Sequence, residues 1–261
     1  MSKSFQETLI GAATRLTPIL ICLALWQAAA SLHVADPEFL PSVGAVLEAF
    51  YDLAKEKTIF VELGVSLLTA GAGLASGILI GVPLGAVMAL SRGADGFFGP
   101  LIKATYSLPK SALIPLFVLW FGVGGLTNVL ATVLTTLLPI VIYTYHGVQG
   151  VPRIFVWSAE AMGTPPATLL RRIILPAALP AILTGVRIAL GFAFIVTIAA
   201  EMIVSNHGIG KLMFLYGDSG AYNYMFAAVI TIVVTAFVAD GLLQLATAHI
   251  LRWQEKVDQH A

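Results

Sequence analysis

Residues 111–152, SALIPLFVLWFGVGGLTNVLATVLTTLLPIVIYTYHGVQGVP, contain no aspartate, glutamate, lysine or arginine. An uncompensated charge in hydrocarbon costs at least about 2.5 kcal/mol, so a long uncharged stretch predicts helices that cross a membrane. One crossing needs about 20 apolar residues, and this stretch is long enough for two. The segment Gly122–Asn128, GVGGLTN, interrupts it and predicts the turn of a helical hairpin.

The composition agrees with a membrane protein. Hydrophobic residues make up 58% of the chain and charged residues 11%, whereas soluble domains carry roughly 25% charged residues. The formal net charge is zero and no Lys/Arg cluster is present, which argues against a nucleic-acid partner. The single cysteine, Cys22, excludes an internal disulfide and a cysteine-rich metal site.

The remaining charges divide the chain into further candidate spans. Together with the hairpin, whose first arm is expected to begin near Ala104 and include Lys110, they predict an all-α integral membrane protein with six transmembrane helices. The basic segment at the start, the apolar core after it and Ala28-Ala29-Ala30 could together also mark a cleavable secretory signal, and we interpret this region as a true helix. The other predicted spans are Leu16–Ala35, Leu63–Ser91, Ile182–Val204 and Tyr224–Ile250.

The basic residues predict the orientation, because lysine and arginine collect in cytoplasmic loops. A cytoplasmic N-terminus leaves only Lys55, Lys57 and Lys211 in outer loops. Both termini and the 150–179 loop are then cytoplasmic. We therefore expect a first helix with an outer amphipathic helix in residues 1–60, a transmembrane domain in 61–250 and a cytoplasmic tail in 251–261. The inner basic residues are Lys3, Arg15, Arg92, Lys103, Arg153, Arg171, Arg172, Arg252 and Lys256.

Two patterns predict how helices are placed. Apolar residues recur at helical spacing after Ser42, a plausible N-cap, and predict a surface helix that contains Val43, Val46, Leu47, Phe50 and Leu53. A second pattern puts a glycine at every fourth position of one span. Such a ridge lets a neighbouring helix approach closely, so we interpret it as a packing surface. The ridge consists of Gly73, Gly77, Gly81 and Gly85.

The cytoplasmic loop is longer than a simple connection requires. Pro152 can begin a helix, and Gly163 suits a left-handed end to it. Thr164 is then expected to cap a second helix that has Pro165 at its first position. The loop therefore predicts two short helices with a sharp turn, which together form a docking site for a cytosolic partner.

This loop and several other stretches resemble the permeases of binding-protein-dependent ABC importers, in particular the nitrate, sulfonate and taurine branch. In that family the loop reads Glu-Ala-Ala, three residues, glycine, nine residues and Ile-x-Leu-Pro; here Gly163 precedes Ile173, Leu175 and Pro176 at the same spacing. The front of the motif differs, since Trp157-Ser158-Ala159 replaces Glu-Ala-Ala and Glu160 comes three residues late. Further matching stretches are Leu40–Ser42, Gly81–Gly85, Pro115–Gly122, Leu175–Gly191, and Glu201 with Gly208–Gly210.

The resemblance implies a function and a set of partners. The chain would be the permease of an importer in the bacterial inner membrane, with a five-helix type I core plus an N-terminal helix. It would pair with a second copy, two cytosolic subunits that hold ATP and magnesium, and a periplasmic binding protein. The cargo would be a small oxyanion such as a sulfonate, taurine or nitrate, although related permeases carry aromatic carboxylates or vitamin precursors. The coupling loop would comprise Trp157, Ala159, Glu160, Ala161, Gly163, Thr164, Arg171, Arg172, Ile173, Leu175 and Pro176.

Charged residues inside spans are candidate functional residues, because they must be paired or hydrated. We expect Arg187 and Asp240 to be structurally paired or to reach a boundary. Lys110 could attract an anion, and Glu201 could contact substrate or bond to the glycine-rich loop after it. Trp120 and Asn128 complete the candidate substrate pathway.

Other chemistry finds little support in the sequence. Gly208-Ile-Gly-Lys211 lacks the first glycine and the Ser/Thr of a phosphate loop, and no zinc-protease motif or serine elbow is present. We therefore expect no cofactor, metal or ATPase site in this chain. Two other classes stay open, a secondary transporter driven by an ion gradient and an intramembrane enzyme.

Overall fold

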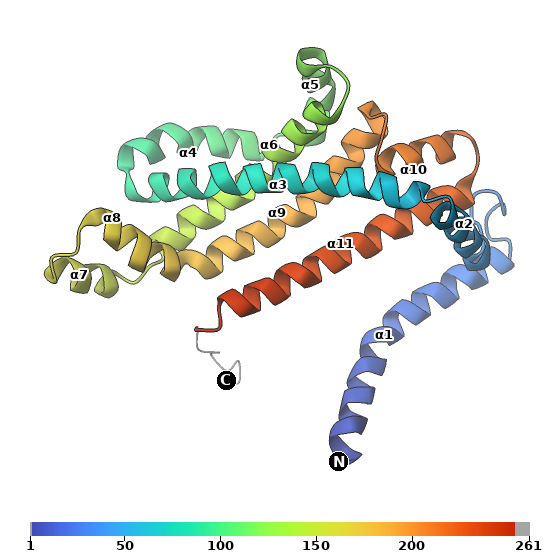
Figure 1. Cartoon of the computed structure of the whole chain (residues 1–261), viewed down its shortest axis with the longest axis horizontal. Coiled ribbons are helices and arrows are strands. Elements are labelled where there is room, and N and C mark those ends of the chain that lie inside the picture. Colours follow the sequence, from blue (N-terminus) through green and yellow to red (C-terminus); the bar gives the residue numbers. More distant parts are fainter. Residues whose placement is uncertain (1, 254–261) are drawn as a thin grey trace. The chain divides into compact units, whose positions relative to one another are not determined.

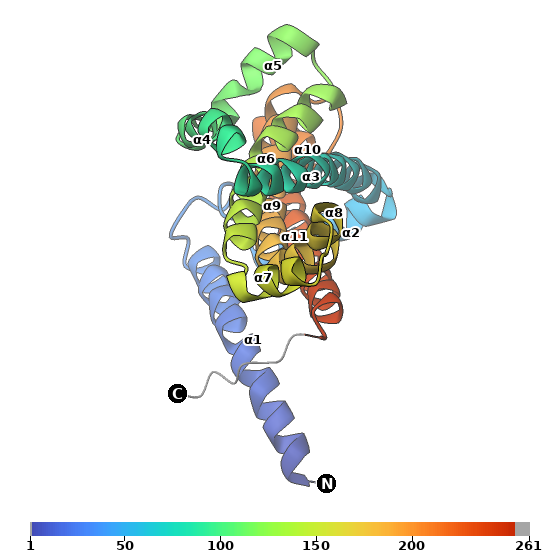
Figure 2. The same ribbon diagram turned by 90° about the vertical axis from the view of Figure 1, so that its left-hand side faces the viewer.

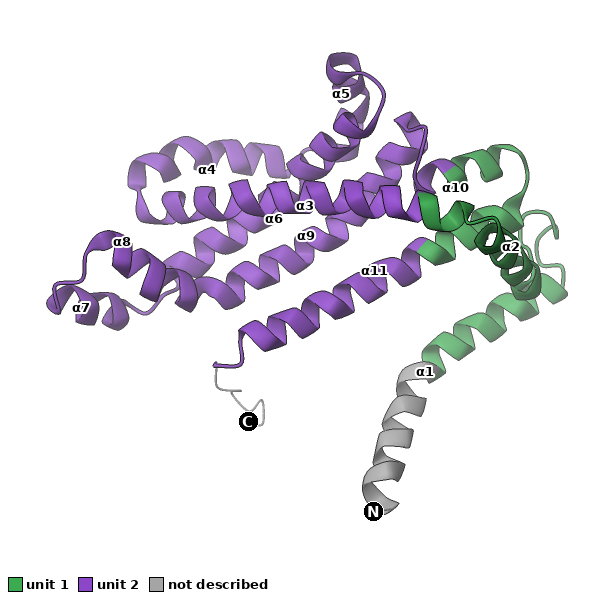
Figure 3. Cartoon of the chain, in the orientation of Figure 1, with its two compact units in different colours: residues 1–61, 212–231 green, residues 62–211, 232–261 purple. Residues whose placement is uncertain are grey.

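The computed structural model of the chain describes the backbone of residues 2–253 and the side chains from residue 17 onward. Every regular element in this part is a helix. The chain forms two compact units, residues 1–61 with 212–231 and residues 62–211 with 232–261 (Figure 3). Of the sequence predictions, the side chains of Lys3 and Arg15 and the tail from residue 254, with Lys256, lie outside the described residues.

The first unit contains α1 (Ser2–Ser31) and the amphipathic helix α2 (Val43–Lys55). The predicted N-cap is confirmed, since the Ser42 Oγ accepts a hydrogen bond from the Ala45 N–H at 3.2 Å. The buried face of α2 consists of Val46, Ala49 and Leu53. Leu47 and Phe50, predicted on the apolar face, are exposed, because the apolar stripe is wider than the surface that covers it.

The second unit is built on three helices that run side by side, α3 (Thr58–Leu90), α6 (Gly125–Gln149) and α9 (Leu175–Val204) (Figures 1 and 2). The glycine ridge of α3 lies against α6. A methyl group added at any of the four glycines would overlap a side chain of α6, at Thr132, Thr136, Ile140 and Thr144 in turn. These partners follow the same four-residue repeat, so the two helices meet ridge against ridge.

Within the part of the chain that the structure describes, four helices are long and apolar enough to cross a membrane, judged by length and composition. Two shorter apolar stretches cover residues 17–31 and 110–121. Four of the six predicted spans are thus found as long helices, the third corresponds to the shorter stretch at 110–121, and residues 17–31 are the described side-chain part of α1, where the first span was predicted. The four are Thr58–Leu90, Gly125–Gln149, Pro166–Val204 and Tyr222–Ile250, the last of which is α11.

The prediction of one continuous third helix from Ala104 through Lys110 is wrong. Instead, α4 (Arg92–Tyr106) folds back beside α3 and is followed by a break, the 3-10 turn η1 (Lys110–Leu113) and α5 (Ile114–Phe121) (Figure 1). Pro109 lacks an N–H group and disfavours the helical conformation in the residue before it, which ends α4. The absence of charge between residues 111 and 122 did not reveal this break.

The fifth span also begins earlier than the predicted Ile182. A short helix α8 (Pro166–Leu169) continues through the π-helical turn η2 (Leu170–Ile174) directly into α9. Pro176 is compatible with this continuity, because proline is tolerated in the first turn of a helix. The chain then passes through α10 (Ile209–Asp218) to α11.

Candidate functional site

The predicted coupling loop starts with the helix α7 (Arg153–Ala161), whose N-cap is Pro152 as predicted. The helix ends at Gly163, which has a φ angle of +76°. The Gly163 N–H donates to the Glu160 carbonyl at 2.9 Å, and the Thr164 N–H donates to the Ala159 carbonyl at 3.0 Å. This pair of bonds is the Schellman helix ending, so the predicted left-handed stop is confirmed.

The prediction that Thr164 caps the next helix is wrong. The N-cap of α8 is Pro165, Pro166 is the first helical residue, and no side chain caps this end. The second short helix is also not separate, because it joins α9 through η2, which carries Arg171 and Arg172. The second half of the loop is therefore continuous with a long helix.

In α7 one small side chain is buried and several large side chains are exposed. Ala159, the part of the family motif that this sequence keeps, is 1% exposed and packs in a cluster with Val148, Leu169, Ile174 and Ala178. In contrast, Trp157 is 57% exposed, and Glu160 and Ala161 are also exposed. Other large side chains of α7 and its C-cap also face outward without cover, namely Ile154, Phe155 and Met162.

Two grooves flank α7. One, of about 320 Å³, is lined by Phe155, Met162, Arg172, Ile173 and Pro176 among others. The second, of about 630 Å³, contains Trp157 and Glu160 together with Arg92 and Arg153. Leu175 packs against the buried cluster instead of facing a groove. The loop therefore combines exposed apolar side chains with hollows that another protein could fill.

A larger cleft of about 860 Å³ lies between α4 and α6. On α4 its lining residues are spaced three or four apart, including Asp95, Gly99, Lys103 and Tyr106, so one face of the helix borders it. The opposite wall comes from one face of α6, and Ile188 and Phe192 of α9 also contribute. The α6 wall includes Thr135, Leu138, Pro139, Ile142, Tyr145, His146 and Gln149.

Of the four predicted pathway residues, only Lys110 borders this cleft. Its Nζ donates to the Tyr106 carbonyl at 2.9 Å and lies 5.1 Å from the centre of the Tyr106 ring. Trp120 lies on α5 and is 62% exposed, whereas Asn128 is 1% exposed and its Oδ1 has no hydrogen-bond partner among the described residues. The structure therefore does not bring these residues together.

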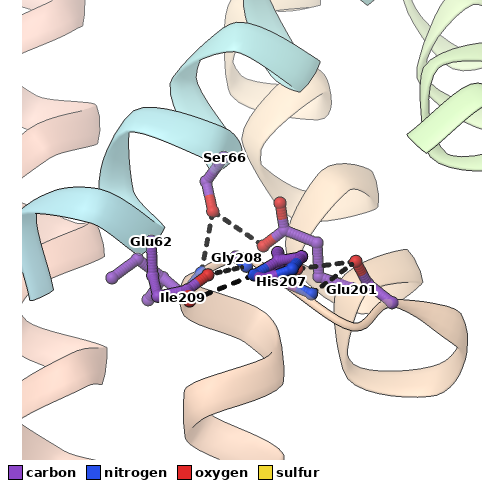
Figure 4. Close-up of polar contacts among 7 residues, drawn as sticks. Glu62, Ser66, Glu201, His207, Gly208 and Ile209 are labelled. Atoms are coloured by element: carbon purple, nitrogen blue, oxygen red, sulfur yellow. Dashed lines mark hydrogen bonds and ion pairs between the residues drawn. The ribbon is translucent and has the colours of Figure 1, made fainter. Parts of the chain in front are cut away.

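Glu201, the fourth, is completely buried near the end of α9 (Figure 4). Its Oε2 accepts hydrogen bonds from the Ser66 hydroxyl of α3 at 2.7 Å and from the Gly210 N–H at 3.0 Å. The bond that the sequence suggested between Glu201 and the glycine-rich loop is thus present. The same Ser66 Oγ accepts the Ile209 N–H at 2.9 Å.

A second carboxylate lies on the same face of α3, one turn before Ser66. Glu62 accepts the N–H of Gly208 and lies 3.3 Å from Nδ1 of His207 (Figure 4). A methyl group added at Gly208 would overlap the Glu201 carboxylate, and one at Gly210 would lie 2.5 Å from the Ile198 carbonyl. Gly208 also has a φ angle of +107°, which favours glycine. We call Glu62, Ser66 and Glu201, with the N–H groups of residues 208–210, the α10 clamp.

Arg187 and Asp240 form the pair that the sequence predicted, with two parallel hydrogen bonds of 2.7 and 2.9 Å between α9 and α11. Such a bidentate pair reduces the cost of placing both charges in a membrane. Among the described residues, no group of three or more His, Cys, Asp or Glu side chains could hold a metal ion.

Comparison with known proteins shows the family to which the chain belongs. A model of the family described as the binding-protein-dependent transport system inner membrane component matches residues 77–252. The chain belongs to this family. It is 31% identical over 242 residues to the taurine transport system permease protein TauC of Escherichia coli (strain K12), which covers 91% of this chain and 88% of the relative.

Other comparisons agree with this assignment. The chain is 33% identical over 253 residues to a protein described as an aliphatic sulfonates transport permease, SsuC of Escherichia coli (strain K12), covering 97% and 96% of the two. Its fold resembles that of a chain in inward-facing MetNI methionine ABC transporter structures, with a TM-score of 0.62, 20% identity and coverage of 77% of this chain and 95% of that one. The chain is therefore an integral multi-pass membrane protein and an ABC importer permease, which is a transport subunit.

Sequence reasoning missed Glu62, Ser66 and the cleft face of α4. Glu62 and Ser66 are four residues apart, so a shared helical face was visible in the sequence. Nothing local indicated that this face meets residues 208–210. The face of α4 was missed because its residues were assigned to a connecting loop and to the start of a span.

Proposed function

We propose that this permease forms, with a second copy, the translocation path of an inner-membrane importer driven by ATP hydrolysis on two cytosolic subunits. The observation that carries the proposal is the loop of α7 and α8, with its exposed Phe155, Trp157 and Met162 and its unbroken helical connection to α9. Exposed aromatic and methionine side chains beside grooves are typical of a protein interface. A periplasmic binding protein would deliver the cargo on the opposite side.

Energy would enter at this loop. Movement of the ATPase subunits would displace α7 and α8, and α9 would follow because η2 joins them without a break. The spans would then switch between inward- and outward-open arrangements, which is alternating access driven from outside this chain. The presence of Trp157 in place of the family's glutamate makes this contact more apolar than in relatives with the full motif.

The basic residues support six membrane crossings with both termini in the cytoplasm. In this arrangement the four long helices supply four crossings. Residues 17–31 and the broken segment of α4, η1 and α5 supply the other two. Broken helices are tolerated at membrane depth where they line a cavity or pack in protein. The break at Pro109 lies next to Lys110, which borders the cleft, so this segment is suited to line a path.

The proposed cargo is a small organic oxyanion of the sulfonate or taurine type. Lys103 and Lys110 border the cleft together with one carboxylate, Asp95. The described residues contain no carboxylate within ion-pair distance of either lysine. An ammonium group inside a membrane cavity attracts an anion, and the relatives TauC and SsuC are named for the transport of taurine and of aliphatic sulfonates.

Purification of the permease with its genetically linked partners, followed by reconstitution in vesicles, tests this function. We expect ATPase subunits to co-elute and taurine or an alkanesulfonate to be taken up only with ATP and the binding protein. Lys110→Met should raise the KM for uptake about tenfold, whereas Lys110→Arg should not. Uptake that persists without ATP and collapses with an uncoupler would instead show a secondary transporter.

A further inference from the structure

We infer that the α10 clamp is a permanent joint that makes α3 and α10 follow α9 through the transport cycle, and that it does not open as a gate. The inference rests on the proposed function, in which α9 receives the movement of the coupling loop. It assigns Glu62, Ser66 and Glu201 as positioning residues. None of the three borders the cleft between α4 and α6.

The start of α10 depends on two other helices. The first N–H groups of a helix have no partner within the helix, and a side chain just before the helix usually accepts one of them. Here the N–H groups of Gly208, Ile209 and Gly210 are accepted by Glu62, Ser66 and Glu201 in turn. Two of these acceptors lie on α3 and one on α9, so α10 begins correctly only when both helices are in place.

The central groups of the clamp are buried. Ser66 is 1% exposed, and Glu201 and Ile209 are 0% exposed. The Ser66 hydroxyl joins all three elements, because it donates to Glu201 and accepts from Ile209. Moving α3 away from α9 would leave a buried carboxylate oxygen and a buried N–H without partners, and such groups are costly to leave unsatisfied. The clamp therefore favours a joint that stays closed.

The clamp leaves no free space around Glu201. Gly208 and Gly210 are both so close to Glu201 that an added methyl group would overlap it or the neighbouring backbone. Interiors packed this closely move between discrete arrangements and do not deform gradually.

The coupling loop and the clamp lie at opposite ends of α9. The helix α9 has 30 residues, which correspond to a length of about 45 Å. The coupling loop joins its first residue and Glu201 lies near its last turn, so the two sites occupy opposite ends of one rod (Figure 1). A displacement applied at the loop reaches α3 and α10 through the clamp. The segment of α4, η1 and α5 would move relative to α3, α9 and α10, because α4 has no buried residue and a break follows it.

A disulfide across the clamp distinguishes a joint from a gate. Glu62 and His207 lie in contact at its exposed edge, and Cys22 can first be replaced by alanine. In the reconstituted complex, oxidation of the Glu62→Cys/His207→Cys variant until no free thiol remains should leave the uptake rate within about twofold of the same sample after reduction. Each single-cysteine variant is the control for oxidation elsewhere. A more than tenfold loss on oxidation that reductant reverses would show that the clamp opens, and would overturn the inference.

Amide hydrogen exchange supplies a second measurement that does not depend on a disulfide or on the cargo. In the purified full complex, Ser66→Ala should raise exchange at residues 208–210 about tenfold, with uptake per ATP reduced and ATP hydrolysis kept. Glu201→Gln keeps an acceptor oxygen and should retain native exchange and uptake, whereas Glu201→Leu should not. Unchanged exchange at residues 208–210 in Ser66→Ala would refute the clamp. Failure of the native complex to take up any cargo with ATP would instead refute the proposed function.

Discussion

Two glycines of this permease lie in opposite surroundings. At Gly85 on α3, an added methyl group would lie 2.6 Å from the Val141 carbonyl oxygen and 2.8 Å from the Thr144 Cβ. At Gly163 in the coupling loop, an added methyl group would meet nothing within 4 Å, but the φ angle is +76°. The first glycine is needed for contact between two helices, and the second for a turn that another residue adopts with strain.

The surroundings of the two glycines differ in the same way. The frame of α3, α6 and α9 consists of small residues at close approach, threonines that bond to backbone carbonyls, and the clamp at Glu201. The coupling loop exposes Phe155, Trp157 and Met162, and its helix α7 contributes one buried residue, Ala159, to the cluster beneath it. This difference agrees with the proposal that the frame keeps one arrangement and that the loop binds a partner.

The largest effect is expected where the frame is closest. Gly85→Ala should destabilise the permease by about 1–3 kcal/mol, because overpacking forces a shift in the backbone of α6. Gly71→Ala on the same helix is the matched control, since nothing lies within 4 Å of its added methyl group. Thermal unfolding in detergent, followed together with the yield of folded protein, measures both. Equal stability of the two variants would show that the ridge is not a close contact.

This contrast also shows what the sequence could and could not reveal. The spans follow from the absence of charge, the ridge from a four-residue glycine repeat, and the Gly163 turn from its position after a helix. These are local patterns. The α10 clamp is not local, because Glu62 lies 146 residues and Ser66 lies 143 residues from the N–H groups that they accept.

The errors have physical causes of the same kind. A charge pattern does not distinguish a continuous span from one broken at Pro109, since both are apolar. Thr164 is a suitable capping residue type, but the chain enters α8 one residue later, at Pro165 and Pro166. Proline at a helix start fixes the entry as effectively as a capping hydroxyl.

A smaller effect is expected at the turn. Gly163→Ala should cost about 1 kcal/mol through its left-handed conformation. Because nothing crowds this position, folding should survive, and the loss should appear as less uptake per ATP hydrolysed. Gly163→Asn should perform better than alanine, since asparagine tolerates this conformation. Full coupling in the alanine variant would contradict the assigned role of the turn.

The smallest effect is expected from a hydrogen bond inside the frame. The Thr136 Oγ1 donates to the Gly73 carbonyl of α3 at 3.2 Å and also to the Thr132 carbonyl of its own helix at 2.9 Å. Thr136→Val keeps the shape and removes these bonds, which should cost about 0.6 kcal/mol, the average for interhelical hydrogen bonds in membranes. A loss in thermal unfolding as large as that of Gly85→Ala would show that hydrogen bonding, and not close approach, holds α3 to α6.

The central claim is that the exposed loop is driven by a cytosolic partner while the frame follows. Trp157→Cys in a Cys22→Ala background tests it most directly, with a membrane-impermeant thiol reagent applied to intact and permeabilised cells and an ATPase subunit present or absent. The account predicts labelling only after permeabilisation, and protection of the cysteine when the ATPase subunit is bound. Labelling in intact cells, or labelling that the ATPase subunit does not change, would contradict it.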